Sequence, residues 1–212
     1  MAGKTESGAR KLGREFYTRP DVLRVARELL GKRLVVADAE TGARLAGLIV
    51  ETEAYAGPED KASHAYGNRR TRRTETMFAE GGTAYVYLIY GMYHQLNVVT
   101  NRAGVPHAVL LRALEPVEGV ERMREHRRVA RDTDLTSGPG KLCRALRVDL
   151  SFDGEDLTGR RVWVEDAGLS IRPRDVEAGA RVGIDYAEEY ASKPWRFWLR
   201  GNAYVSRKGR AG

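Results

Sequence analysis

Residues 48–64, LIVETEAYAGPEDKASH, place two glutamates at the end of an apolar run. Residues 44–55 have the alternation of a β-strand, in which successive side chains point to opposite faces. The face that becomes acidic carries Leu45, Ile49, Glu51, Glu53 and Tyr55. The other face is more apolar and must pack on the core. The first face changes from apolar to acidic as it approaches the end of the strand. Strand ends that lead into loops are common positions for catalytic groups.

Spacing alone leaves two interpretations of Glu51 and Glu53 open. In the first, both side chains are exposed and form ion pairs with some of the many arginines. In the second, one of them is a catalytic carboxylate. Because the two residues share a strand face, alternation does not distinguish between them.

A second unusual segment, residues 83–97 (TAYVYLIYGMYHQLN), holds four of the ten tyrosines. Tyr85 and Tyr87 share a strand face, and Tyr90 stands before Gly91, where the chain can turn. Tyrosines in strands are commonly half-buried core residues whose hydroxyl finds a partner. The alternative is a set of flat surfaces for nucleobases, since each base that stacks on an aromatic ring gains roughly 1–3 kcal/mol.

Arg112 lies within another predicted strand, residues 107–114, where alternation places it beside Ala108, Leu110 and Leu114. If this face is buried, the arginine needs an anionic partner such as a carboxylate or a phosphate. If the strand emerges from the core at this point, the side chain can instead extend to water. The pattern favours neither alternative.

The charge of the chain indicates which partners it favours. Lysine and arginine number 36 against 29 acidic residues, which gives a net charge of +7. Such an excess favours polyanionic partners. Arginines gather in residues 69–73, RRTRR, and again in residues 122–131. The second group is typical of the solvated face of a helix.

Several classes of protein are disfavoured. The single cysteine, Cys143, has no partner for an internal disulfide, and the four histidines lack the spacing of a metal site. We therefore expect no metal and no cofactor. No apolar run has membrane-spanning length and no signal peptide is visible. A soluble cytoplasmic protein is expected, without membrane association and associated with the nucleoid if the source is bacterial.

Apolar periodicity predicts a helix over residues 19–31 and another from Pro116 to about residue 130. A short helix follows the Gly-Pro-Gly turn at residues 138–140, and surface loops are expected at residues 69–73 and 130–137. Strands are predicted at residues 32–38, 44–55, 83–90, 107–114, 161–165 and 194–200. Because strands and helices do not alternate regularly, the expected fold is α+β, with a curved, largely antiparallel sheet flanked by helices.

The two ends of the chain are expected to lie outside this domain. Residues 1–14 are polar, basic and Gly-rich, which predicts a disordered tail. Residues 15–207 should form a single domain, and residues 208–212 a short second tail.

A strand-end carboxylate, a cluster of aromatic rings and a basic exterior together suit chemistry on a base within nucleic acid. An enzyme that acts on a base takes it out of the stack and holds it between aromatic or apolar groups. Cleavage of an N-glycosidic bond needs an activated water and a negative charge near an electron-poor sugar. One carboxylate can serve both purposes.

Four segments resemble, in order, the motifs of one family: VETEAYAGPEDKASHA, MFAEGGTAYVYLIYGMYHQLNVV, VLLRALEP and LTSGPGKLCRAL. The resemblance is to the alkyladenine (3-methyladenine, or methylpurine) DNA glycosylases, and it runs from about residue 15 to about residue 206. It implies a single α+β domain and a monofunctional enzyme of base excision repair. Such an enzyme flips alkylated or deaminated purines (3-methyladenine, 7-methylguanine, hypoxanthine, ethenoadenine) out of duplex DNA. An activated water then hydrolyses the N-glycosidic bond and leaves an abasic site.

The resemblance implies three catalytic roles. Glu53 in ETEAY matches the general base that activates the attacking water, and Glu51 does not, so the resemblance separates the two glutamates. Arg112 matches an arginine that helps to position the water and the nucleotide. The backbone carbonyl of Val182, in ARVGI, matches a further holder of that water. Glu51 is left as a speculative acid for neutral bases.

The resemblance also implies a base pocket. Tyr55 and His64 match the residues that stack on the two sides of the flipped base, and Tyr87 matches a further wall. Asn97 matches an asparagine that clashes with the exocyclic amine of normal guanine. Tyr90 matches a wedge that enters the minor groove and fills the space that the base vacates.

Double-stranded DNA with damaged purines is the expected partner, bound by a monomer. Met92 and Tyr93 match residues that line the DNA surface beside the wedge, and Arg69 and Arg70 are expected to contact the DNA. No matched position offers an amine nucleophile beside Glu53, so we expect no lyase step. A noncatalytic nucleic-acid-binding module on the same fold is the alternative. A metal-dependent hydrolase is a third hypothesis, and it would use Glu51, Glu53, Glu59, Asp60 and His64.

Overall fold

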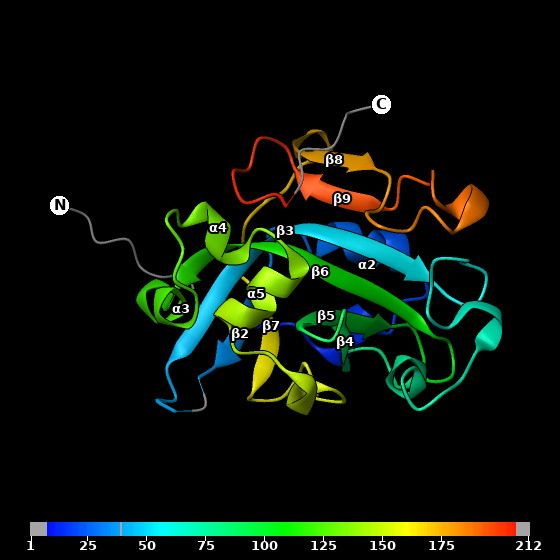
Figure 1. Ribbon diagram of the computed structural model, residues 1–212, viewed down its shortest axis with the longest axis horizontal. Helices are drawn as coiled ribbons and strands as arrows, with labels where there is room; N and C mark the ends of the chain where they lie inside the picture. The colour runs from blue at the N-terminus through cyan, green and yellow to red at the C-terminus, as the bar shows by residue number, and fades with distance from the viewer. Residues whose placement is uncertain (1–7, 39, 207–212) are drawn as a thin grey trace.

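The structure is a computed structural model that describes residues 8–38 and 40–206. Within these ranges, nine strands in one sheet and five α-helices form an α+β fold, which confirms the predicted fold class (Figure 1). The strands are β1 (Arg10–Lys11), β2 (Arg33–Ala37), β3 (Arg44–Ala56), β4 (Ala84–Ile89), β5 (Tyr93–Thr100), β6 (His107–Glu118), β7 (Val162–Asp166), β8 (Val176–Gly179) and β9 (Arg196–Leu199). The helices are α1 (Arg14–Tyr17), α2 (Val22–Glu28), α3 (Val120–His126), α4 (Thr133–Thr136) and α5 (Pro139–Ala145).

Strand β3 organises the sheet, whose main order is β1-β7-β2-β3-β6-β5-β4 with antiparallel neighbours. One edge of β3 pairs with β6 along nearly its whole length. The other edge pairs first with β2 and then, at residues 51–53, with β9. The sheet therefore branches at β3, and Glu51 and Glu53 lie between strands on both sides.

Two register shifts interrupt the pairing of β3 with β6 on either side of Glu51. They leave Val50 and Arg112 without a residue directly opposite. Leu45 and Ile49, before the shifts, lie in the main core. An extra residue in a strand re-aims the side chains that follow it, and such irregularities are common next to active sites.

Beyond the shifts, Thr52 and Ala54 face the main core. The Thr52 hydroxyl donates to the carbonyl of Ala26 in α2 at 2.9 Å, and Ala54 is part of the core cluster. Glu51 and Glu53 consequently point away from the face that Leu45 and Ile49 occupy. The prediction from uninterrupted alternation is therefore wrong, because Glu51 and Glu53 do not share a face with Leu45 and Ile49.

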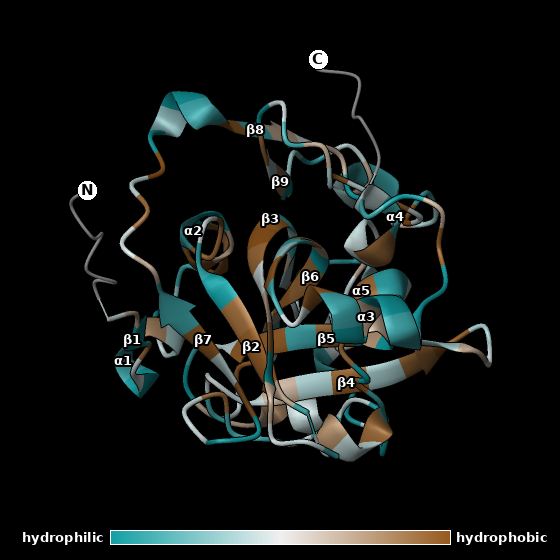
Figure 2. Ribbon diagram, turned by 90° about the vertical axis from the view of Figure 1, so that its left-hand side faces the viewer, coloured by the Kyte–Doolittle hydropathy of each residue, from teal (hydrophilic) through white to brown (hydrophobic). Residues whose placement is uncertain are grey.

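The main core fills the space between one face of the sheet and helices α2 and α5. Val25 and Leu29 from the α2 region and Leu142 and Leu146 from the α5 region belong to the same cluster as Leu111 of β6. The apolar brown of β3 and β6 inside the molecule contrasts with the teal surface of α3 in Figure 2. With the inner face filled in this way, the opposite face of β3 to β6 is left for the site.

The prediction that a helix begins at Pro116 is wrong. Strand β6 continues through Pro116 to Glu118, and α3 starts at Val120 after Gly119, whose φ is 72°. Strand β5 pairs only with residues 107–110, so this end of β6 is a sheet edge, where proline is tolerated. Periodicity also missed β5 and β8, and α4 occupies part of the predicted loop at residues 130–137.

The N-terminal boundary also differs from the prediction. Arg10 and Lys11, within the expected tail of residues 1–14, pair with β7, and Leu12 is buried. Residues 1–7 and 208–212, on which the other tail predictions rest, lie outside the described residues. In the ranges that the structure does describe, no helix has both the length and the apolar character needed to cross a membrane.

Candidate active site

A cavity of about 700 Å³ lies on the face of the sheet opposite the main core. Strands β3 to β6 supply its floor, and residues 62–64 and 181–186 add to its walls. It brings together eight residues that the sequence predicts for the site: Glu53, Tyr55, His64, Tyr87, Tyr90, Asn97, Arg112 and Val182. Since these residues come from six separate segments, their convergence is a property of the fold.

Glu53 is fully buried, and three donors surround its carboxylate. Its Oε1 accepts from the backbone N–H of Val182 at 2.8 Å and lies 3.1 Å from Nη1 of Arg112. Its Oε2 accepts from the Tyr55 hydroxyl at 2.7 Å. A buried carboxylate is costly unless it is paired and hydrogen-bonded, and here both conditions are met. The role predicted for the Val182 carbonyl stays a prediction.

Of the two alternatives for Arg112, the structure shows the buried one, in which the guanidinium has an anionic partner. Its Nε donates to Oε1 of Glu51 at 2.8 Å, and only a few per cent of its side chain is exposed. Burial opposes its charge, but Glu53 and Glu51 outweigh that effect and raise the pKa of Arg112. Of the two interpretations of the glutamates, ion pairing with arginine is confirmed, whereas surface exposure is wrong, because both side chains are 0% exposed.

Aromatic rings form the walls of the cavity. The ring of His64 meets that of Tyr87 edge-on, with centroids 4.6 Å apart, and its Nδ1 lies 3.0 Å from the Tyr85 hydroxyl. Burial, helped by Arg73, lowers the pKa of His64 to about 4, so the ring is neutral at physiological pH. Burial and Glu53 raise the pKa of Tyr55 well above its ordinary value, which keeps its hydroxyl available as a donor.

Asn97 is held against the adjacent strand. It pairs with Tyr85 across β4 and β5, and its Nδ2 donates to the Tyr85 carbonyl at 3.1 Å. The side chain is 4% exposed and lines the cavity. Its amide is therefore fixed at the cavity floor, where a ligand would meet it in one orientation.

The turn between β4 and β5 carries exposed apolar side chains and projects from the edge of the molecule (Figure 2). Tyr90 is 83% exposed with a φ of 52°, and Met92 is 66% exposed. Tyr93 packs on the start of α5, since a Cβ at Gly140 would lie 3.1 Å from its ring. A supported hairpin with an exposed tip is suited to contact a partner.

The predicted DNA-contacting arginines differ in their surroundings. Arg70 forms an ion pair with Glu75 at 2.5 Å, whereas Arg69 lines a smaller cavity of about 340 Å³. That cavity shares Ser63, His64 and Tyr186 with the larger one. Neither arginine lines the larger cavity.

Sequence reasoning missed several residues of the site. Asp60, expected at the surface, is fully buried and forms a two-pronged ion pair with Arg181, at 2.5 and 2.7 Å. The Arg181 guanidinium also lies 4.6 Å from the centre of the Tyr55 ring, and that of Arg73 lies 5.1 Å from the Tyr87 ring. The only signal for Arg181 was its position next to Val182 in ARVGI.

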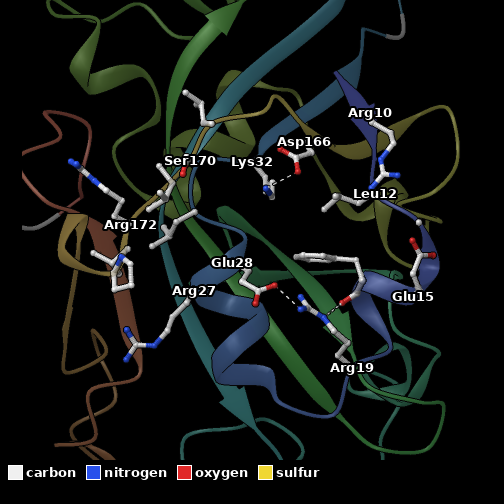
Figure 3. A pocket seen from close by; sticks show the side chains of 17 residues that line it. Arg10, Leu12, Glu15, Arg19, Arg27, Glu28, Lys32, Asp166, Ser170 and Arg172 are labelled. Atoms are coloured by element: carbon white, nitrogen blue, oxygen red, sulfur yellow. Dashed lines mark hydrogen bonds and ion pairs between the residues drawn. The ribbon is translucent and has the colours of Figure 1, made fainter. Parts of the chain in front are cut away.

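A second cavity, of about 740 Å³, lies between the α1 and α2 region and residues 169–173 (Figure 3). None of the predicted site residues lines it. Lys32 pairs with Asp166 at 3.0 Å and Arg19 pairs with Glu28 at 2.5 Å across its wall. Glu28 and Asp166 are therefore each paired with a cation of the same lining.

No group of three or more His, Cys, Asp and Glu side chains in the described part of the chain is arranged to hold a metal ion. Three of the four acidic residues of the third hypothesis, Glu51, Glu53 and Asp60, are engaged by arginine. Glu51 and Glu53 contact Arg112, and Asp60 contacts Arg181.

The fold and the cavity define an α+β protein with a buried, arginine-paired carboxylate at the floor of an aromatic-walled pocket. Residues 15–203 match the model of a family described as methylpurine-DNA glycosylase, and the chain belongs to this family. The family predicted from the four sequence motifs is thereby confirmed.

Curated relatives extend the match over nearly the whole chain. A protein of Desulfitobacterium hafniense (strain Y51) is 49% identical over 207 residues, which cover 94% of this chain and 100% of the relative. One of Bacillus cereus (strain G9842) is 49% identical over 199 residues, 89% of this chain and 95% of the relative. One of Alkaliphilus oremlandii (strain OhILAs) is 47% identical over 206 residues, 93% and 100% respectively. Each is named "Putative 3-methyladenine DNA glycosylase".

Proposed function

We propose that this protein is a monofunctional DNA glycosylase that removes alkylated or deaminated purines from duplex DNA by hydrolysis. The observation that carries the proposal is the fully buried Glu53 carboxylate at the floor of a cavity with aromatic walls. The names of the relatives, which match over nearly the whole chain, agree with it.

In the proposed reaction Glu53 is the general base. A water held by Glu53, Arg112 and the Val182 carbonyl loses a proton to the carboxylate while its oxygen bonds to C1′ of the sugar. The N-glycosidic bond breaks, and its electron pair leaves with the base. The negative carboxylate also stabilises the electron-poor sugar in the transition state. The donors on Glu53 hold it in place for both tasks.

The walls of the cavity suit a damaged purine. Tyr55, His64 and Tyr87 would enclose the flipped base, and tyrosine faces attract a cationic purine by roughly 0.5–2 kcal/mol. A neutral His64 adds a ring without a repelling charge. Asn97, fixed by Tyr85, would clash with the exocyclic amine of normal guanine and so disfavour it. 7-Methylguanine has the same amine, but its positive charge makes it a better leaving group.

The hairpin and the basic segment suit the duplex. Tyr90 would enter the minor groove and fill the space left by the base, which offsets part of the cost of unstacking. Met92 and Tyr93 would lie along the DNA beside it. Arg69 would meet a phosphate, whereas Arg70 would first have to leave Glu75. We propose that one monomer carries the complete site.

The proposal excludes a lyase step. The cavity lining contains three arginines but no lysine, so it offers no amine to form a Schiff base with the sugar. The expected product is an intact strand with an abasic site.

The test is a panel of duplexes, each with one 7-methylguanine, hypoxanthine, ethenoadenine or normal guanine, incubated with the protein in excess chelator. Release of the modified bases, with strand breaks only after heat or alkali, is the expected result. Tight binding without base release would instead indicate a noncatalytic binding module. Loss of release in chelator would indicate a metal-dependent hydrolase, and breaks before alkali would indicate a lyase.

A further inference from the structure

Glu51 is as deeply buried as Glu53, yet it does not line the cavity. Its Oε1 accepts from Nε of Arg112 at 2.8 Å and from the hydroxyl of Ser206 at 2.9 Å, and lies 3.0 Å from Nε of Arg196. Its Oε2 accepts from the backbone N–H of Ser206 at 2.6 Å. These contacts engage both oxygens of the carboxylate.

The same contacts determine where the Arg112 guanidinium points. Its Nε is held by Glu51 at 2.8 Å and its Nη2 donates to the Ser206 hydroxyl at 3.2 Å. Its remaining nitrogen, Nη1, lies 3.1 Å from Oε1 of Glu53. Because a guanidinium is a rigid planar fork, fixing two of its nitrogens also fixes the direction of the third.

We propose that Glu51 and Ser206 are positioning residues that hold Arg112 against Glu53, so that the segment after β9 completes the active site. This inference rests on the proposed function. It gives Glu51 a different role from that of an acid for neutral bases. An acid must reach the base, and it is Arg112, not Glu51, that lines the cavity.

The arrangement is balanced in charge, which explains why it is stable when buried. Glu51 and Glu53 face Arg112 and Arg196, two carboxylates against two guanidinium groups. Removing one charge would leave another uncompensated in a buried place. A change at Ser206 keeps all four charges and removes only hydrogen bonds, so it tests positioning with less effect on folding.

The first experiment is a double-mutant cycle on single-turnover excision at saturating enzyme, with duplexes that contain neutral hypoxanthine or cationic 7-methylguanine. Glu51→Gln is expected to slow both reactions by the same factor, about 10–100-fold, as a misplaced catalytic group does. In an Arg112→Met background, Glu51→Gln should slow excision by less than about a further 2-fold, because the guanidinium that Glu51 holds is absent. A loss confined to hypoxanthine, or equal losses in the two backgrounds, would overturn the proposal.

The second experiment replaces Ser206 by alanine, with Ser192→Ala as the matched control. Ser192 donates to the Glu189 carbonyl at the surface, so only the local hydrogen bond is lost there. Ser206→Ala is expected to slow excision roughly 2–10-fold, at unchanged DNA affinity, and only when Arg112 is present. Equal rates for the two alanine variants would contradict the positioning role while leaving the glycosylase assignment intact. A wild-type protein that binds the duplex and releases no base would contradict both.

Discussion

Two cavities of the protein differ little in size and greatly in what they hold. The cavity between the α1 and α2 region and residues 169–173, here called the groove, measures about 740 Å³. The cavity over β3 to β6 measures about 700 Å³. In the groove, the side chains of Glu28 and Asp166 are 38% and 36% exposed and pair with cations at its surface. In the cavity, Glu53 is 0% exposed and sits among Tyr55, Arg112 and a backbone N–H.

Burial of charge, and not volume, distinguishes the candidate site from the groove. A partly exposed ion pair has little effect on stability and needs no further support. A buried carboxylate needs several donors, which here come from different segments of the chain. Three pairs of variants, each with one residue in the cavity and one in the groove, and a single variant of His64 can test this contrast.

The largest contrast is expected for the carboxylates. Glu53→Gln keeps the size of the side chain but removes the base, so single-turnover excision should fall about 10²–10⁴-fold. Glu28→Gln, in the groove, should leave the rate within about 2-fold, since it alters a surface ion pair. A Glu53→Gln protein that excises at the wild-type rate would refute the proposed mechanism.

The aromatic walls should give the next contrast. Tyr87→Leu removes one stacking surface, which is worth roughly 1–3 kcal/mol and corresponds to roughly 5–150-fold in excision of ethenoadenine. Phe16→Leu removes an aromatic ring from the groove, where it packs edge-on against Tyr17 with centroids 5.3 Å apart. It should lower the melting temperature without a change in excision once the protein is folded. Equal kinetic losses would mean that the two walls are not functionally distinct.

Exposed apolar residues provide a third contrast. Tyr90→Ser should reduce excision from duplex DNA about 10-fold, because the wedge offsets part of an unstacking cost of a few kcal/mol. Excision from a single strand, where little stacking opposes extrusion, should change much less. Leu169→Ser, at the rim of the groove, is 47% exposed in the native protein and should affect neither substrate. A Tyr90 effect of the same size on both substrates would argue against a wedge.

The smallest effect concerns pH. The pKa of His64 is lowered to about 4 in the folded protein, so the unfolded chain binds this proton first as the pH falls. Its contribution to stability is complete above the unfolded pKa of about 6.5 and is lost towards pH 4. With allowance for partial exposure, about 1 kcal/mol of unfolding free energy should disappear between pH 7 and 5. In denaturant titrations at several pH values, the unfolding free energy of His64→Gln should fall less between pH 7 and 5 than that of the wild type. An equal fall in both proteins would contradict the prediction.

Local features of the fold were predictable from the sequence. Alternation and aromatic content located β2, β3, β4, β7 and β9, and the apolar stripe of residues 19–31 located α2. Pro116 was misleading because its effect depends on whether the strand is an edge there. That property belongs to the sheet and not to the local residues.

The site was predictable only in part, for a similar reason. Periodicity indicated that a carboxylate near the end of β3 needs an explanation, and the family motif separated Glu53 from Glu51. The register shifts that turn both carboxylates away from the main core arise from pairing with β6, which no local pattern reports. The same holds for Asp60 and Ser206, whose partners are distant along the chain.

The branching of the sheet at β3 has a consequence for how the protein is made. Glu53 receives its backbone donor from a residue 129 positions later, and Glu51 from one 155 positions later. A chain that emerges from the ribosome N-terminus first therefore carries both glutamates long before the partners that hold them. The donors from Val182 and Ser206 reach Glu53 and Glu51 only after those residues have been made, so a shorter nascent chain lacks the contacts that fix the two carboxylates.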